Sequence, residues 1–201
     1  MASQIALFGE ADASPQLPDG MRYAEDLITE SEEQGLAQFI AGLPLQPFEF
    51  TGGYLGNRRV LSFGSRYDYA AQRVAEAPVI PTELLGLRQA AAAFAKLDPE
   101  SLQQALVAEY ASGAGIGWHR DRPHYGDIIG ISLLAPCTFR LRLKTGKTWQ
   151  RSALNALPRS AYILTGESRS AWEHSIPPLD QLRYSVTFRT MRPPFSRRGV
   201  E

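Results

Sequence analysis

The feature that most constrains the fold is a succession of short β-rich segments in the second half of the chain. From residue 104 onward, apolar and β-branched runs are separated by turn residues such as Pro136, Gly146 and Pro158. The runs are QALVAEY, DIIGISLL, CTFRLRLK, TWQRSAL, SAYILTG and RYSVTFRT. Strands at this spacing, with no long helix between them, indicate a β-sandwich or jelly roll (a double-stranded β-helix) rather than a βαβ sheet.

The first half predicts helices and a strand pair in front of this jelly roll, so the fold class is mixed α+β. SEEQGLAQFIAGL has apolar residues at helical spacing, and Ser31 is its expected cap. PTELLGLRQAAAAFAKL predicts a second helix with Pro81 in its first turn. Between these two helices, RRVLSFGSRYDYA alternates apolar and polar residues, which indicates a strand pair or an extended loop. The expected units are a loose arm over 1–20, helices and a recognition segment over 21–100, the jelly roll over 101–192 and a tail over 193–201.

Composition excludes few classes of protein but indicates the expected cellular compartment. The single cysteine, Cys137, cannot form an internal disulfide, which fits a reducing compartment. No apolar stretch approaches the roughly 20 residues that span a bilayer, and the first residues do not resemble a signal peptide. We therefore expect a cytoplasmic protein with no membrane partner.

Charge is unevenly distributed although the formal net charge is zero. Residues 1–50 carry nine acids and one base, whereas residues 101–201 carry seven acids and fourteen bases, nearly all of them arginine. Arginine suits bidentate recognition of carboxylates and phosphates. The basic half either faces an anionic ligand or is ordinary solvated surface.

The stretch GWHRDRPHYGD contains candidate metal ligands. Alternate side chains of a strand share a face, so His119 and Asp121 can reach one ion while His124 is out of step. The remaining histidine, His174, is the candidate third ligand. Two imidazoles and one carboxylate that leave positions open form the triad of non-heme Fe(II) oxygenases. The alternative is a buried histidine and a surface aspartate.

Two arginines on one predicted strand are candidate anion ligands. Arg183 and Arg189 lie six residues apart in LRYSVTFRT, on one face and about 20 Å apart at the usual rise of an extended strand. Buried charges need partners, and a dicarboxylate such as 2-oxoglutarate could supply one. The alternative is two exposed arginines on the polar face of an edge strand.

These blocks together resemble a known family. GWHRD, GESRSAWEHSIPPL and LRYSVTFRT are similar, in order and spacing, to the three motifs of the AlkB-like 2-oxoglutarate/Fe(II) dioxygenases. RRVLSFGSRYDY resembles that family's nucleotide-recognition segment, and the resemblance covers roughly residues 50–192. It implies an enzyme that uses Fe(II), 2-oxoglutarate and O2. The implied reaction is oxidative demethylation of N-methylated bases in DNA or RNA, which releases succinate, CO2 and formaldehyde and is typical of nucleic-acid repair.

The resemblance also implies a role for each matching residue. The implied metal ligands are His119, Asp121 and His174; the implied 2-oxoglutarate ligands are Arg183, Arg189, Tyr110 and Ser185. The candidate substrate contacts are Arg59, Phe63, Tyr67 and Tyr69, with Arg58 and Arg66 as further candidates for phosphates. Trp172 is expected to pack near the metal and Arg169 to support the structure. The alternative for the aromatic residues, above all for Phe63, is that they are core residues of a strand pair and do not contact the substrate.

Three positions depart from the family pattern. Ala108 and Ser185 replace asparagines, and Pro123 replaces the acidic residue with which DNA-repair members contact the damaged base. Cofactor use is therefore better supported than repair of any particular base. A tRNA modification, a protein or a small molecule is the alternative substrate, and a β-sandwich binding module without turnover is a further alternative.

Overall fold

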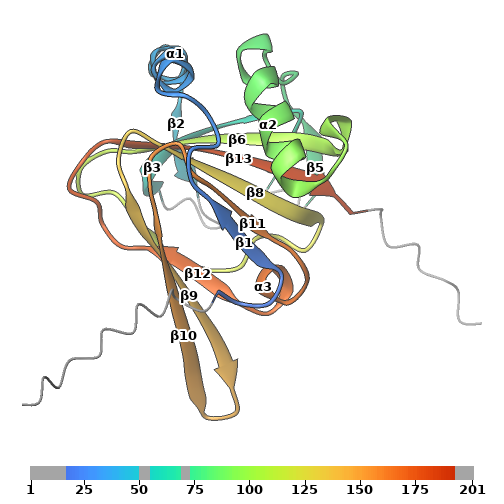
Figure 1. Ribbon diagram of the computed structural model, residues 1–201, viewed down its shortest axis with the longest axis vertical. Coiled ribbons are helices and arrows are strands. Elements are labelled where there is room, and N and C mark those ends of the chain that lie inside the picture. Colours follow the sequence, from blue (N-terminus) through green and yellow to red (C-terminus); the bar gives the residue numbers. More distant parts are fainter. Residues whose placement is uncertain (1–16, 50–54, 69–72, 193–201) are drawn as a thin grey trace, which may run out of the picture.

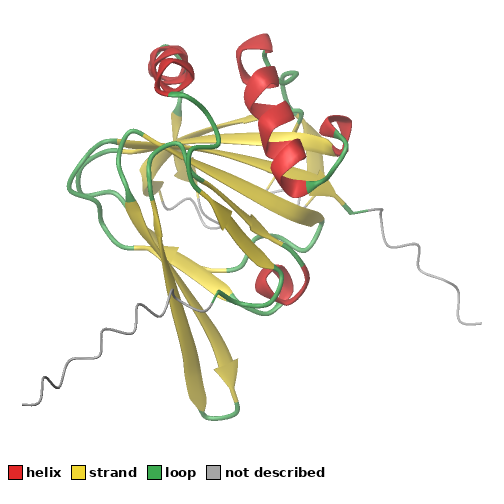
Figure 2. Cartoon of the chain, in the orientation of Figure 1, coloured by secondary structure: helices red, strands yellow, loops and turns green. Residues whose placement is uncertain are grey.

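The computed structural model describes residues 17–49, 55–68 and 73–192. Most of the arm expected over 1–20 and all of the tail expected over 193–201 lie outside these residues. The described residues form two antiparallel sheets with helices on one side (Figures 1 and 2). None of their helices is both long and apolar enough to cross a membrane.

The larger sheet has seven strands in the order β1-β11-β8-β13-β6-β3-β2. These strands are β1 (Met21–Ala24), β2 (Gln46–Glu49), β3 (Leu55–Phe63), β6 (Leu102–Tyr110), β8 (Tyr125–Leu133), β11 (Ala161–Leu164) and β13 (Arg183–Met191). Strands from both halves of the chain therefore share one sheet, and the predicted boundary at residue 100 stays a prediction. β13, the last strand in sequence, lies at the centre of this sheet.

The smaller sheet has four strands in the order β10-β9-β12-β7. These strands are β7 (Ile116–His119), β9 (Cys137–Thr145), β10 (Thr148–Ala156) and β12 (Glu173–Ile176). A separate hairpin pairs β4 (Ser65–Asp68) with β5 (Arg73–Glu76). The jelly-roll class is confirmed, and every predicted β-rich run contains a strand. β12 was not predicted, because four residues are too few to show an alternating pattern.

Helices cover the face of the larger sheet that is turned away from the smaller sheet (Figure 1). They are α1 (Glu30–Ala41) and α2 (Leu85–Ala95), with the short turns η1 (Thr82–Leu84) and η2 (Pro99–Ser101), while α3 (Gly166–Ser170) lies beside β12. The predicted cap Ser31 is wrong. Thr29 is the N-cap: its hydroxyl accepts from the Glu32 amide at 3.2 Å, and the Glu32 carboxylate accepts from the Thr29 amide at 2.8 Å. This reciprocal capping box begins the helix two residues earlier than apolar spacing alone suggested.

Alternation along β13 assigns its two faces to different environments. Tyr184, Val186 and Phe188 join the apolar cluster under α1 and α2. Arg183 and Arg189 point the other way, toward the smaller sheet, and both are buried. The strand period, together with the central position of β13, thus places two cations in the interior of the sandwich.

Gly130 on β8 provides a test of this packing. A Cβ at this position would lie 2.3 Å from the ring carbon Cζ of the buried Tyr162. We expect Gly130→Ala to lower the free energy of unfolding by about 1–3 kcal/mol, since the ring has to move within a packed core. The matched control is Gly35→Ala in α1, where no atom lies within 4 Å of the added methyl and alanine favours the helix. Urea unfolding of both variants is the measurement, and equal midpoints would contradict the packing.

Candidate active site

The two histidines that were predicted as ligands face each other across neighbouring strands. His119 ends β7 and His174 lies in β12, and their Cα atoms are direct partners in the antiparallel ladder. Their ring centroids are 4.3 Å apart. His119 Nδ1 lies 2.8 Å from the carbonyl oxygen of Gly117, which can only accept, so this nitrogen donates and Nε2 keeps its lone pair.

Asp121 completes the group from the loop after β7. Its Oδ2 lies 3.8 Å from His174 Nε2, and its Oδ1 accepts from Arg189 Nη2 at 3.1 Å. Two ligands at about 2.0–2.2 Å from one ion lie no more than about 4.4 Å apart, so the Asp121–His174 separation is compatible with a shared ion. As the described side chains stand, however, no three His, Cys, Asp or Glu residues are set to hold a metal ion. One oxygen of the Asp121 carboxylate, Oδ1, is instead held in the ion pair with Arg189.

Burial and neighbouring charges set the protonation of these groups. Burial and, to a lesser extent, the neighbouring His119 lower the pKa of His174 to about 3. Burial also lowers the pKa of His119. Burial by itself would raise the pKa of Asp121, but Arg189 and the histidines outweigh it and leave this pKa well below its usual range. The site therefore presents two neutral imidazoles and a carboxylate, which are the forms that bind a metal.

Arg183 is a buried cation with unused donors. It is fully buried, and its Nε donates to Ser132 Oγ at 2.9 Å. Its Nη1 and Nη2 have no hydrogen-bond partner among the described residues, and its Cζ lies 5.2 Å from the centroid of the Tyr110 ring. The alternative of an exposed arginine on an edge strand is wrong, because β13 is central. Two parallel buried donors are suited to a carboxylate.

Arg189 lies at the other end of the same face. Its Nη1 donates to Gln104 Oε1 at 2.8 Å and its Nη2 to Asp121, while its buried Nε has no partner among the described residues. Sequence reasoning missed Ser132 and Gln104 as partners of the two arginines. Gln104 is the direct ladder partner of Arg189, so the strand register would have revealed it.

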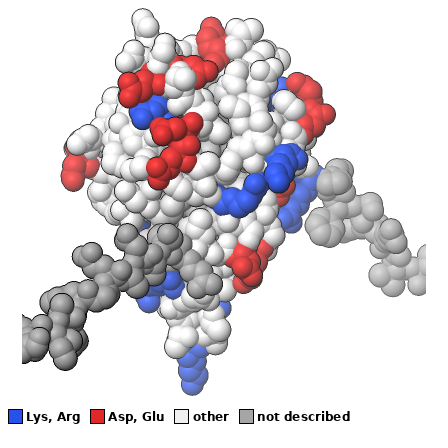
Figure 3. All heavy atoms as spheres, viewed as in Figure 1, with Lys and Arg blue, Asp and Glu red and all other residues white. Residues whose placement is uncertain are grey.

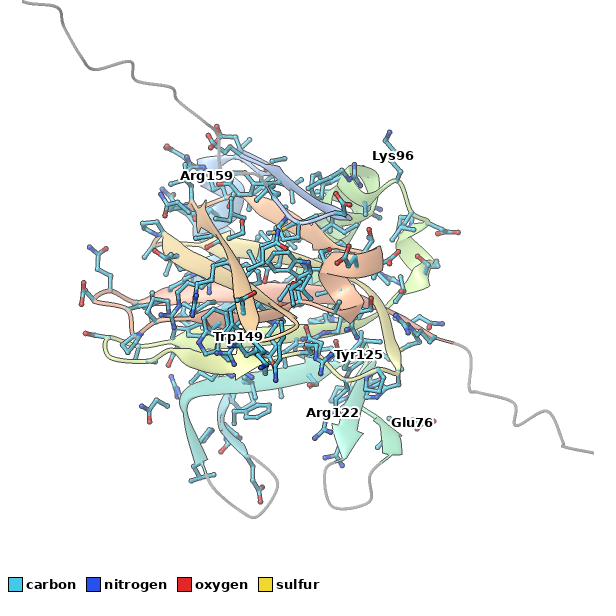
Figure 4. All side chains as sticks on the ribbon, turned by 90° about the horizontal axis from the view of Figure 1, so that it is seen from below. Glu76, Lys96, Arg122, Tyr125, Trp149 and Arg159 are labelled. Atoms are coloured by element: carbon cyan, nitrogen blue, oxygen red, sulfur yellow. The ribbon has the colours of Figure 1, made fainter. Side chains whose placement is uncertain are left out.

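Arg169 in α3 fixes the loop that carries Asp121. The guanidinium donates to the carbonyls of Gly126 at 2.9 Å, Arg122 at 2.6 Å and Tyr125 at 2.9 Å. Figure 4 labels Arg122 and Tyr125 in this part of the molecule. The contacts support the structural role expected for Arg169. The side chain of Trp172, which precedes β12 by one residue, is buried in the interior cluster, and its proximity to a metal stays a prediction.

We expect Arg169→Ala to destabilise the chain by about 3 kcal/mol, because one buried and two partly buried carbonyls lose their charged donor. Iron retention should fall as well, since the loop that carries Asp121 is no longer held. The matched control is Glu167→Ala, an exposed residue in the same helix. Denaturant unfolding and metal analysis after gel filtration are the measurements, and wild-type values for Arg169→Ala would contradict this role.

The predicted substrate contacts are only partly supported by the structure. Arg59 makes a bidentate ion pair with Glu109, at 2.7 and 2.8 Å. Phe63 is buried in the cluster under the helices. Alternation along β3 turns Arg59 and Phe63 to the helix-covered face of the larger sheet, away from His119. This arrangement does not favour a contact with the substrate, which stays a prediction for both residues. Tyr67 lies in β4, but its side chain and all of Tyr69 are outside the described residues.

Arg58 of β3 faces the interior, on the opposite side of the sheet from Arg59 and on the same side as Val60. Its Nη1 donates to the Tyr110 hydroxyl at 3.3 Å, and its Cζ lies 4.5 Å from the Phe48 ring centroid. Its buried Nε has no partner among the described side chains and backbone. Burial is the main cause of the low pKa of His119, and the charge of Asp121 opposes it. The positive charge of Arg58 lowers this pKa as well. Arg58, rather than Arg59, thus lies beside the candidate metal ligands.

Comparison with known proteins decides the family. The model of the 2OG-Fe(II) oxygenase superfamily matches residues 24–192. The chain belongs to this superfamily. It is an enzyme that uses Fe(II), 2-oxoglutarate and O2, as the motifs predicted, and the relatives below support the resemblance to the AlkB-like group. The alternative of a binding module without turnover is therefore wrong.

Curated relatives extend beyond the length of this chain. An Arabidopsis thaliana protein, "Alkylated DNA repair protein ALKBH8 homolog", is 30% identical over 210 residues, which cover 90% of this chain and 58% of the relative. A Mus musculus protein, "tRNA (carboxymethyluridine(34)-5-O)-methyltransferase ALKBH8", is 29% identical over 192 residues, which cover 86% of this chain and 27% of the relative. The chain thus spans less than two thirds of either protein.

Solved structures support the fold. The structure titled "The structure of OsALKBH1" superimposes with a TM-score of 0.63 at 18% identity, covering 87% of this chain and 100% of that chain. A prolyl-4-hydroxylase from Pseudomonas putida superimposes with a TM-score of 0.57 at 14% identity, covering 86% of this chain and 93% of that chain. Likenesses at these identities show the fold alone, so the choice of substrate has to be argued from the site.

Proposed function

We propose that the chain oxidatively demethylates N-methylated bases of nucleic acid, releasing succinate, CO2 and formaldehyde. The observation that carries the cofactor part is Arg183, whose two Nη atoms are buried without partners among the described residues, on the same interior face of β13 as Arg189, which holds Asp121. A buried cation with two free donors is costly unless an anion meets it. A dicarboxylate co-substrate supplies that anion.

The residues present fit the cofactors in chemical type. His119, Asp121 and His174 would hold Fe(II), since two neutral imidazoles and a carboxylate are the ligands of an iron centre with open positions. Arg183 would bind the distal carboxylate of 2-oxoglutarate, with Tyr110 beside it. Arg189 holds Asp121 and lies where it can approach the other carboxylate. When bound, iron and 2-oxoglutarate together supply the oxidising power that hydroxylates a C–H bond.

The chain's own groups position the substrate and exclude water. Tyr110, Ser185 and Arg183 are buried in the interior of the sandwich, so a co-substrate held by them would be shielded from solvent. Arg58 enters the same interior with an unused donor, so it can bind a carbonyl or phosphate oxygen of an extruded nucleotide. Hydroxylation of an N-methyl carbon gives a hemiaminal, which loses formaldehyde without further help from the protein.

The nucleic-acid part rests on the relatives and on Arg58. The names of the two relatives refer to alkylated DNA and to tRNA, which favours a base in either polymer. A tRNA modification is the second candidate. It is favoured by the mouse relative's name and by Pro123, which cannot supply the acidic contact to a damaged base. The cytoplasmic location stays a prediction.

Incubation of iron-loaded protein with a panel of modified nucleosides and oligonucleotides, followed by mass spectrometry, tests the proposal. We expect loss of 14 mass units from an N-methylated base (about one CH2, in line with oxidative demethylation) and formaldehyde equal to the succinate formed. The His119→Ala variant should give neither product. Addition of oxygen without formaldehyde would favour hydroxylation of a tRNA modification. Turnover that no nucleic acid stimulates would contradict both candidates.

A further inference from the structure

The outer face of the smaller sheet gathers cations and indoles. His174, Phe139, Leu141 and Leu154 are buried toward the interior, so their neighbours along each strand point outward. We call this surface the outer face. Its side chains are Trp118 of β7, Arg140, Arg142 and Lys144 of β9, Trp149 and Arg151 of β10, and Glu173 of β12, while Ser175 of β12 points the same way but is buried and accepts from Arg140.

The centre of the outer face is already ordered. The guanidinium carbon of Arg142 lies 4.4 Å from the ring centroid of Trp118 and 4.3 Å from that of Trp149. Glu173 Oε2 accepts from Arg142 Nε at 2.7 Å. Arg140 lies over the same Trp118 ring at 5.1 Å. Two indoles and two guanidinium groups are therefore held in place before any ligand binds, which lowers the entropic cost of binding.

The charge of this surface is strongly one-sided. The hairpin from Cys137 to Ala156 contains five Lys or Arg residues and no Asp or Glu. It projects away from the body on the side opposite α1 and α2 (Figure 1), and cationic side chains mark its tip (Figure 3). Glu173, the acid of the outer face, is neutralised by Arg142. Lys144, Lys147 and Arg151 remain exposed to solvent.

We infer that the outer face binds the phosphodiester backbone of the nucleic-acid substrate, outside the base-binding site. Cations at strand spacing can track successive phosphates, and partly exposed indoles can stack on bases or sugars. This inference rests on the proposed function, since it names the surface that would hold a polymer substrate.

The outer face lies directly behind the candidate metal ligands. Glu173 and Ser175 flank His174 in β12, and Trp118 precedes His119 in β7. A strand bound on this face is therefore separated from the ligands by one sheet and can pass around the free edge formed by β7. Oligonucleotides long enough to reach both surfaces should bind more tightly than a single nucleoside.

Charge reversal tests the inference without turnover. The probe is a labelled single strand of about 20 nucleotides, which exceeds the roughly 4–16 nucleotides of a typical single-strand site. Its fluorescence anisotropy is titrated with the metal-free full chain at several salt concentrations, which gives the affinity and the slope of its dependence on salt. We expect Lys144→Glu and Arg151→Glu each to weaken binding roughly tenfold and to reduce the slope by about 1. The matched control is Lys96→Glu, an exposed lysine beyond α2 that lies well apart from Trp149 in Figure 4.

The outcomes separate this inference from the proposed function. Affinity of Lys144→Glu and Arg151→Glu equal to that of Lys96→Glu would overturn the inference, even if the wild type oxidises methylated strands. Preferential binding of anionic phosphatidylserine vesicles over the oligonucleotide would overturn it too. Loss of affinity in the two hairpin variants, with no oxidation of any strand by the wild type, would support this surface and contradict the proposed reaction.

Discussion

Replacing Asp121 with alanine is expected to abolish succinate formation through loss of bound iron. The carboxylate lies between His174 and Arg189, and a low pKa keeps it ionised. Changes to groups that only orient a ligand typically cost 10–100-fold in metal affinity, so removal of a ligand should cost more than about 100-fold. Equilibrium dialysis with Fe(II), or with Mn(II) as a redox-stable probe, measures this loss directly.

Two further variants make the result specific. Asp121→Asn keeps the volume and an acceptor for Arg189, so it should fold well and still bind metal poorly. Asp180→Asn removes an exposed carboxylate elsewhere in the same half of the chain and should bind metal like the wild type. Wild-type metal affinity in Asp121→Asn would show that a different residue is the carboxylate ligand.

Periodicity accounts for the parts of the fold and site that the sequence predicted. The β-rich runs are separated by turn residues, so each was recognised as a strand and the jelly roll followed. The buried direction of Arg183 and Arg189 follows from the same two-residue period, once β13 is known to be central. The capping box at Thr29 was missed because helical spacing locates the middle of a helix better than its first residue.

Other features depend on register and on chain reversals that a single sequence does not reveal. Neighbouring residues in β3 face opposite sides of the sheet, and the sequence alone did not show which of the two candidates, Arg58 or Arg59, faces the interior. Ser132 and Gln104 are ordinary polar residues until pairing places them beside the buried arginines. The meeting of His119 and His174 needed the family motifs, since their separation in sequence carries no geometry by itself.

Replacing Arg183 with alanine is expected to raise the concentration of 2-oxoglutarate needed for half-maximal turnover from roughly 30-fold to a few thousand-fold. Truncating one partner of a buried, hydrogen-bonded charge pair costs about 2–5 kcal/mol, and each 1.4 kcal/mol is a factor of ten. Arg183→Lys keeps the charge but not the two parallel donors, so its requirement should lie between those of the wild type and the alanine variant. Titration of succinate formation at saturating iron is the measurement.

A stability readout separates a role in binding from a role in folding. Ligand bound only to the native state raises the melting temperature, so 2-oxoglutarate with Mn(II) should stabilise the wild type and not Arg183→Ala. Arg88 is the matched control: it is also a buried arginine, but its donors are already paired with the Leu102 carbonyl and Glu100. Arg88→Ala should therefore lower the melting temperature and leave the shift produced by 2-oxoglutarate unchanged. The same shift in Arg183→Ala as in the wild type would mean that the unused donors of Arg183 meet some group other than the co-substrate, and the carboxylate site would have to be sought elsewhere in the sandwich.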